Sequence, residues 1–291
     1  MSSIAVSSLI RPPFSKGSAG IRAQLESSLG EQLASTLLLR ERVAPLTVPF
    51  GIAAMDELTG GLPRGALTEI VGLASSGRTG TMLSALAGAT RRHEVCALVD
   101  ASDSFDPASA AAAGVDLERL LWVRCATAKN TTARNFSNPR NTGFAFGGVL
   151  EQVLKVTDLL LQAGGFGMVV VDLGDIPADS ARRVPLTSWF RFRRAVEPTA
   201  TVLLLLEQEP CAKTCASLVL EMQAEAICAS DSTGNSASSS HLGRPYIPKQ
   251  AVVSHAALLR SLRFRADVVR SWVSRRPPQS AGARFQLRTA I

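Results

Sequence analysis

Short apolar runs alternate along the chain with segments whose apolar residues recur at helical spacing. Continuous apolar runs of strand length are typical of strands that are buried on both faces of a sheet. Their alternation with helices predicts an α/β fold, with a mostly parallel central sheet covered by helices on both faces. The predicted strands are 66–71, 95–99, 120–124, 166–171, 201–206, 216–222, 262–269 and 285–287. The predicted helices are 81–92, 107–113, 147–162 and 186–197.

Composition divides the chain into four parts. Residues 1–47 are expected to hold a flexible N-terminus and an amphipathic helix, because isoleucine or leucine recurs every four positions between residues 21 and 37. Residues 48–228 are the predicted α/β core. Residues 229–259 begin with a serine- and glycine-rich stretch and are predicted to be a polar loop insertion. Residues 260–291 are predicted to be basic strands and a tail that complete the core.

The 291 residues exclude several classes of protein. All apolar runs are of strand length, which excludes a membrane span, and we expect no secretory signal at the N-terminus. Five cysteines, an odd number, favour a reducing cytoplasm over a disulfide framework. Cys211 and Cys215 have no second pair and no histidine near them, which argues against a zinc site there.

Positive charge is concentrated near the C-terminus. Residues 241–291 hold ten arginines and lysines and one acid, a net charge of +9, whereas residues 1–240 hold 21 basic and 23 acidic residues, a net charge of −2. Such a segment favours a polyanion or an acidic protein surface as its partner. A solvated basic tail without a partner is the alternative.

A glycine-bounded loop is the first candidate for chemistry. Gly72-Leu73-Ala74-Ser75-Ser76-Gly77-Arg78-Thr79 lies between a predicted strand and a predicted helix and matches G-x4-G-K-[ST], except that Arg78 replaces lysine. Backbone N–H groups of such a loop favour an anion, and the Thr79 hydroxyl would face Mg²⁺. A guanidinium is wider than an ammonium group, so we expect phosphate attraction to survive better than catalysis. A turn that binds nothing is the alternative.

A second candidate element is the apolar run that ends at Asp172. An acid at the carboxyl end of a buried strand is suited to hold Mg²⁺, directly or through water. Many apolar strands end in aspartate, so Asp172 alone does not indicate a Mg²⁺ site. It strengthens the prediction only together with the glycine-bounded loop.

Several segments, in the same order, resemble the bacterial RecA recombinase family. They are GGLPRGALTEIVGLASSGRT at 60–79, DASDSFDP at 100–107, AGVD at 113–116 with two leucines at 120–121, TVLLLLEQ at 201–208, and the strands 216–222 and 266–270. The resemblance runs with gaps from Val48 to Leu287. It implies a RecA-like P-loop fold, with ATP and Mg²⁺ as cofactors.

The resemblance also assigns the nucleotide site. The implied nucleotide-binding residues are Gly72, Ser75, Ser76, Gly77, Arg78, Thr79, Gly80 and Gln208. The implied Mg²⁺ residues are Thr79 and Asp172.

Three positions depart from the family together. Arg78 stands in place of the lysine, Ser102 in place of the glutamate that orients the attacking water, and Ser109 in place of the tyrosine that stacks on adenine. The chain therefore resembles the ImuA-type accessory proteins of damage-induced mutagenesis, which work with polymerase homologues and have a weakened ATP site. That resemblance implies RecA or an error-prone polymerase complex as a partner.

Two other functions remain open from the sequence. The chain could be a working DNA-dependent ATPase in which Asp103 replaces the missing glutamate, or an interaction protein similar to the division inhibitor SulA. The N-terminal helix either packs on a neighbouring protomer, as its position in the RecA family implies, or on its own core.

Basic clusters are the candidate surface for single-stranded or damaged DNA. One follows the Asp172 strand, where aromatic residues interleave with arginine; the aromatics also share one helical face, so a core role for them is the alternative. The other is C-terminal, where an acidic protein partner is the alternative. The candidate arginines are Arg182, Arg183, Arg191, Arg193, Arg194, Arg263, Arg265, Arg270, Arg275 and Arg276.

Overall fold

The computed structural model describes residues 46–125, 147–229, 259–271 and 282–288. The predicted N-terminal helix, the polar insertion, and Arg275 and Arg276 lie outside these residues. No helix in the described ranges is long and apolar enough to span a bilayer.

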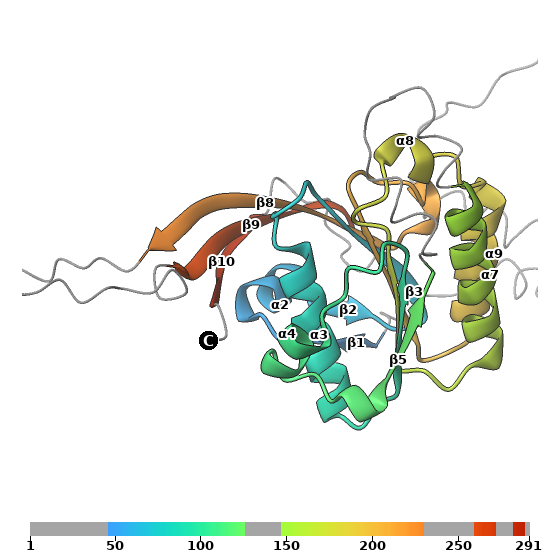
Figure 1. Cartoon of the computed structure of the whole chain (residues 1–291), viewed down its shortest axis with the longest axis horizontal. Coiled ribbons are helices and arrows are strands. Elements are labelled where there is room, and N and C mark those ends of the chain that lie inside the picture. Colours follow the sequence, from blue (N-terminus) through green and yellow to red (C-terminus); the bar gives the residue numbers. More distant parts are fainter. Residues whose placement is uncertain (1–45, 126–146, 230–258, 272–281, 289–291) are drawn as a thin grey trace, which may run out of the picture. The chain divides into compact units, whose positions relative to one another are not determined.

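Eight strands form a single sheet in the order β10-β9-β8-β3-β7-β6-β4-β5 (Figure 1). From β5 to β8 the neighbouring strands run parallel, whereas β9 is antiparallel to both β8 and β10. The predicted mostly parallel α/β fold is confirmed. The strands are β3 (Ala66–Val71), β4 (Cys96–Asp100), β5 (Leu120–Arg124), β6 (Met168–Asp172), β7 (Val202–Glu207), β8 (Leu218–Ala229), β9 (Leu259–Ser271) and β10 (Gly282–Arg288).

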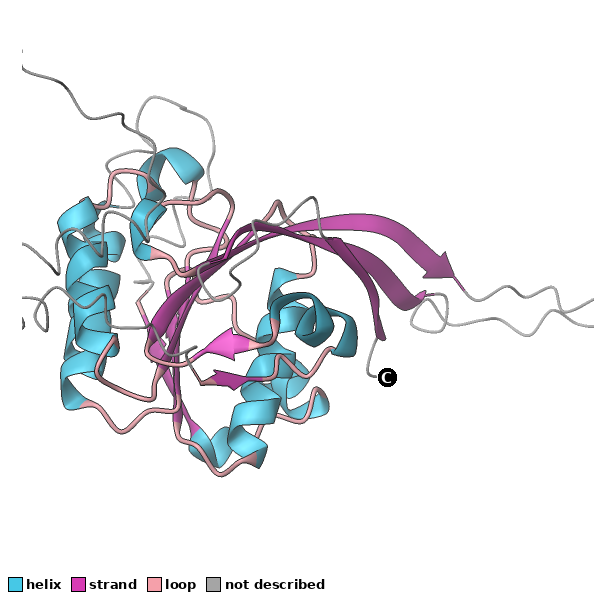
Figure 2. Cartoon of the chain, turned by 180° about the vertical axis from the view of Figure 1, so that it is seen from behind, coloured by secondary structure: helices cyan, strands magenta, loops and turns pink. Residues whose placement is uncertain are grey.

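Helices cover both faces of the sheet, as its buried strands require. One face packs against α2 (Ala53–Thr59), α3 (Arg78–Arg91) and α4 (Pro107–Ala112), and the other against α7 (Gly147–Ala163) and α9 (Leu186–Val196) (Figures 1 and 2). Two hydrophobic cores result, one on each face. Every residue of β3 and β7 is buried, including Glu69 of β3 and Glu207 of β7 among their apolar neighbours.

The strand register brings the functional loops to one edge of the sheet. Val71 pairs with Glu207, and Asp100 pairs with Asp172, so the parallel strands end side by side. The segments that follow β3, β4, β6 and β7 therefore leave the sheet at its carboxyl edge, where ligands of open α/β sheets bind.

The C-terminal strands are longer than the sequence predicts. β8 and β9 have 12 and 13 residues, and with β10 they curve away from the rest of the sheet (Figure 1). Two aromatic rings, Phe264 and Phe285, hold this ribbon to the core on the side of α2 and α3, with ring centroids 5.8 Å apart. Three register shifts interrupt the pairing of β8 with β9, and such bulges bend strands.

The sequence pattern missed the short elements. They are α2, α8 (Ala178–Ala181) and the two-residue strands β1 (Thr47–Val48) and β2 (Leu62–Pro63). α2 has seven residues, of which only Met55 is buried, so it shows no helical period. It ends at Gly60, whose positive φ of 77° favours glycine.

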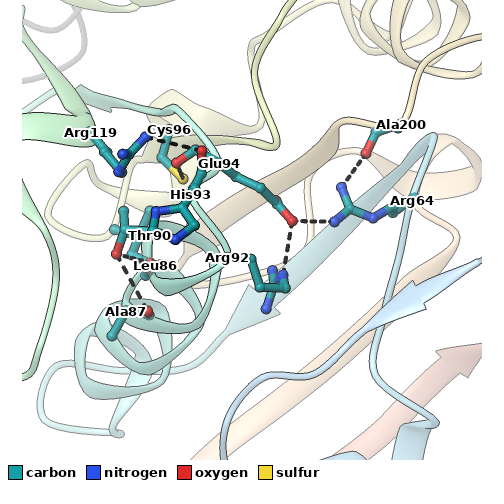
Figure 3. Close-up of polar contacts among 10 residues, drawn as sticks. All are labelled: Arg64, Leu86, Ala87, Thr90, Arg92, His93, Glu94, Cys96, Arg119 and Ala200. Carbon is teal, nitrogen blue, oxygen red and sulfur yellow. Dashed lines mark hydrogen bonds and ion pairs between the residues drawn. The ribbon is translucent and has the colours of Figure 1, made fainter.

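An ionic cluster lies at the opposite, amino edge of the sheet (Figure 3). One carboxylate oxygen of Glu94 accepts from Arg64 at 2.5 Å and from Arg92 at 2.9 Å. Arg64 also donates to the carbonyl of Ala200 at 2.7 Å. The cluster joins the segments that precede β3, β4 and β7, so it stabilises the sheet away from the candidate site.

We predict that Phe264→Ala lowers the free energy of unfolding by about 3–5 kcal/mol, because it removes a buried ring from a packed core. The neighbouring exposed Val269 lies on the same strand, and Val269→Ala should change stability by no more than about 0.5 kcal/mol. Urea denaturation followed by circular dichroism measures both. Equal effects would show that the ribbon does not depend on this contact.

Candidate functional site

The glycine-bounded loop joins β3 to α3 in the expected strand–loop–helix arrangement. The loop spans residues 72–77, and α3 begins at Arg78 with no side chain capping its first turn. Gly77 has a φ of 92°, and a Cβ there would lie 2.8 Å from the ring of Phe264. Glycine is therefore required for both conformation and space.

A cleft of about 300 Å³ opens beside this loop. One side consists of polar loop residues and the first turn of α3, where free N–H groups favour an anion. The other side is apolar and comes from β9 and β10. The lining residues are Ser75, Ser76, Gly77, Arg78, Thr79, Gly80, Leu262, Phe264 and Leu287.

Arg78 is turned toward the carboxyl edge of the sheet. Its side chain is buried, and Nη2 donates to the carbonyl oxygen of Gly174 at 3.3 Å. Burial lowers the pKa of Arg78, while the charges of Asp172, Asp175 and Glu207 raise it. A Cβ on Gly174 would lie 3.2 Å from Nη1, so the guanidinium packs on a glycine backbone.

The same carbonyl of Gly174 ties Gln208 to this network, since Gln208 Nε2 donates to it at 3.2 Å. Asp172 accepts from the Gly174 N–H at 2.8 Å. Burial raises the pKa of Asp172 to about 6, with further contributions from Asp100 and Asp175. Of the two expected Mg²⁺ residues, Thr79 is exposed and lines the cleft, whereas Asp172 is not among the lining residues and lies beside Arg78.

Asp100 organises the loop after β4, a role that the sequence pattern did not reveal. Its carboxylate accepts from the backbone N–H groups of Ser102, Ser104 and Phe105 at 3.0–3.2 Å, and from the indole of Trp122 at 3.2 Å. The bond from the Ser102 N–H to the Asp100 carboxylate, two residues earlier, is that of an Asx turn.

Asp103, the candidate replacement acid, is fully engaged elsewhere. Its two carboxylate oxygens accept from Arg124 Nε at 2.6 Å and Nη2 at 2.5 Å. This hydrogen-bonded pairing lowers the pKa of Asp103. A bidentate arginine holds the carboxylate on β5 and fixes its direction.

Two buried carboxyl groups lie close together behind the carboxyl edge, and the apolar pattern concealed them. Glu69 lies within β3, and Glu207 is the last residue of β7; neither has exposed surface. Glu69 Oε1 accepts from the N–H groups of Cys211 and Ala212 at 2.9 and 2.6 Å. Burial raises the pKa of Glu69. Burial, followed by the charge of Glu69, raises the pKa of Glu207 to about 8.

Candidate DNA-binding arginines near α9 mostly have partners on the protein. Arg182 pairs with Asp179 and Glu209, and Arg191 pairs with Asp158. Arg193 donates to the carbonyl of Thr214, Arg183 is exposed and also engaged, and Arg194 is exposed. The interleaved aromatics Trp189 and Phe192 are buried in the core and pack edge to face, so the core alternative holds for them.

Acids from neighbouring positions also offset the charge of the C-terminal ribbon. Arg265 pairs with Asp267 on β9, and Arg284 pairs with Glu225 on β8. Arg270 donates to the carbonyl of Lys213. Arg263 is exposed and has no hydrogen-bond or ion-pair partner among the described residues. The surface formed by the C-terminal segment is therefore less basic than its sequence alone indicates, because β8 adds acidic residues that lie elsewhere in the sequence.

Comparison with known proteins shows similarity to RecA over part of the chain. The family model of the RecA N-terminal domain matches residues 22–132. Over about half of its length, the chain is similar to RecA. The RecA protein of Bartonella quintana (strain Toulouse) is 35% identical over 153 residues, which are 52% of this chain and 38% of that protein. The RecA protein of Symbiobacterium thermophilum is 37% identical over 155 residues, 52% of this chain and 37% of that protein. The match therefore spans less than two fifths of the length of either relative.

The raised pKa of Glu207 predicts a pH dependence of stability. A carboxyl group whose pKa rises on folding contributes most below its unfolded pKa of 4.5, and that contribution is lost as the pH rises through about 8. Glu207→Gln should therefore gain stability relative to the wild type as the pH rises from 5 to about 8.5. Urea midpoints in metal-free buffer measure this difference, with the exposed Glu209→Gln as the matched control. A stability difference between Glu207→Gln and the wild type that stays constant from pH 5 to about 8.5 would contradict the raised pKa of Glu207.

Proposed function

We propose that the chain is a RecA-like accessory protein of DNA recombination, repair or damage-induced translesion mutagenesis. In this proposal it binds DNA and protein partners, and its nucleotide site binds ATP weakly or not at all and turns over little of it. The observation that carries the proposal is the direction of Arg78, whose buried guanidinium faces Gly174 and three carboxyl groups at the sheet edge.

The direction of Arg78 bears on phosphate binding through charge. A P-loop lysine places its positive charge against the phosphates of the nucleotide. It strengthens phosphate binding only if no other group of the protein already neutralises that charge. Here Asp172, Asp175 and Glu207 already attract the cation of Arg78. A bound triphosphate would have to compete with these carboxyl groups. The backbone N–H groups of the loop remain suited to an anion, so weak phosphate binding without turnover fits the site best.

The segment after β4 points the same way. A general base must lie within hydrogen-bond reach of the attacking water. Ser102 has no carboxylate, and the carboxylate of Asp103 is held by Arg124. The working-ATPase alternative would have to break this ion pair. The hydroxyl of Ser109 bonds to Asp106 at 2.5 Å, where the RecA resemblance implies a stacking tyrosine.

Partner binding remains part of the proposal. Similarity to RecA supports DNA as a ligand, and the ImuA-type resemblance adds RecA or an error-prone polymerase complex. Exposed arginines on α9 and on the ribbon would contact phosphates, and the number of phosphates neutralised sets the salt dependence.

We predict that ATP hydrolysis in the presence of single-stranded DNA is slow and that Arg78→Ala and Asp103→Ala change it by no more than about twofold. The reason is that the charge of Arg78 is already attracted by three carboxyl groups, and that Arg124 holds the carboxylate of Asp103. Steady-state phosphate release by the full-length protein measures the three rates. Rapid, DNA-stimulated turnover that Arg78→Ala abolishes would overturn the proposed loss of catalysis in favour of the ATPase.

We also predict that the DNA affinity falls with salt and that Arg263→Ala weakens it, lowering the slope of log K against log salt by about one. Arg265→Ala is the matched control on the same strand; its effect should be smaller because Arg265 already pairs with Asp267. Fluorescence anisotropy with a labelled oligonucleotide, titrated with salt, measures both. No binding at physiological salt would favour the SulA-like interaction protein.

A further inference from the structure

Three ligating side chains converge on the sheet face that α7 and α9 cover. They come from β3, from the end of β7 and from the turn that follows β7: Glu69, Glu207 and Cys211. One carboxylate or thiol atom of each lies within 4.8 Å of the other two, and all three residues are buried. The cluster is separate from the cleft beside the loop, whose lining contains none of these residues.

The second observation is that three carboxylate oxygens lack a hydrogen bond of good geometry among the described residues: both oxygens of Glu207 and Oε2 of Glu69. The groups that approach Glu207 are the N–H and the thiol of Cys211, and the thiol belongs to the same cluster. Both residues have no exposed surface. Unpaired carboxylates are costly to bury, and three such oxygens beside a thiol are the pattern of an incomplete coordination shell.

We propose that Glu69, Glu207 and Cys211 bind one divalent transition-metal ion of the zinc type. Zinc accepts carboxylate and thiolate ligands together in tetrahedral sites, whereas Mg²⁺ and Ca²⁺ take oxygen ligands. Three protein ligands leave a fourth position for water.

The surroundings of the cluster suit a metal ligand set. The N–H groups of Cys211 and Ala212 hold one oxygen of Glu69, which leaves its other oxygen for the ion. Such outer contacts orient ligands in known metal sites. Two carboxylates, one thiolate and a divalent ion carry a net charge of −1, and the guanidinium of Arg78, which interacts with Glu207, balances it.

Binding would also change the protonation of the ligands. The Cys211 thiol loses its proton to solvent when sulfur coordinates the ion, and so does any proton held between the two carboxyl groups. No oxidation or reduction takes place. The bound ion would join β3, β7 and the turn after β7, directly behind the network that holds Arg78 and Gln208.

The test is a Co²⁺ titration of the untagged, full-length protein after removal of metal with a chelator. We expect a thiolate-to-Co²⁺ charge-transfer band and tetrahedral d–d bands at one equivalent, both removed by Zn²⁺. Cys211→Ser should lose the charge-transfer band. Loss of an outer-shell partner lowers metal affinity by roughly 10–100-fold, and Glu207→Gln, which removes a direct ligand, should lower the Co²⁺ affinity by at least as much. Cys96→Ala, which removes a buried cysteine at the opposite end of the sheet, should bind as the wild type does.

Two results would overturn the proposal: wild-type protein that gives no thiolate band with Co²⁺, or a band that persists in Cys211→Ser. The wild-type titration does not depend on any variant folding, and circular dichroism of Glu207→Gln separates lost ligation from lost structure. A negative result would leave the two carboxyl groups sharing a proton in place of an ion. The measurements of ATP hydrolysis and DNA affinity do not depend on the metal titration, so they test the proposed function separately.

Discussion

The balance of charge at the carboxyl edge of the sheet is the constraint on which the site depends. Parallel register brings Asp100, Asp172 and Glu207 to the ends of neighbouring strands, and most of their surroundings are apolar. Like charges cannot be buried together without a cation or protons. Arg78 supplies a cation to Asp172 and Glu207, and its buried guanidinium lies at this edge, against the carbonyl of Gly174.

This constraint connects the arginine of the loop with the segment that follows β4. An arginine in the loop reaches the carbonyl of Gly174, where Gln208 also donates. The loop after β4 closes around the carboxylate of Asp100, and Asp103 turns outward to Arg124. These interactions join the loop after β3, the loop after β4 and the segment after β6, so polar contacts stabilise the carboxyl edge of the sheet.

Sequence analysis predicted the fold well and the site in part. Mostly apolar strands such as β6 and β7 and the long helices were recognisable because burial on both faces leaves a nearly continuous apolar pattern. The direction of Arg78 and the Asp103–Arg124 pair could not be predicted, because both depend on contacts between residues distant in sequence. Glu69 and Glu207 were overlooked since each continues an apolar strand. The pairing of Arg284 with Glu225 could not be predicted, because the two residues come from different segments of the sequence.

The ribbon formed by β8, β9 and β10 links two surfaces through the alternation of a single strand. On β9, Phe264 points into the core beside the loop, while its neighbours Arg263 and Arg265 lie on the more exposed side. Because the side chains of these three residues alternate, a slip of one residue in the pairing would carry the ring into solvent and the guanidinium groups into the core. The wall of the cleft and the outer charged face therefore share one register, and neither can be rearranged without the other.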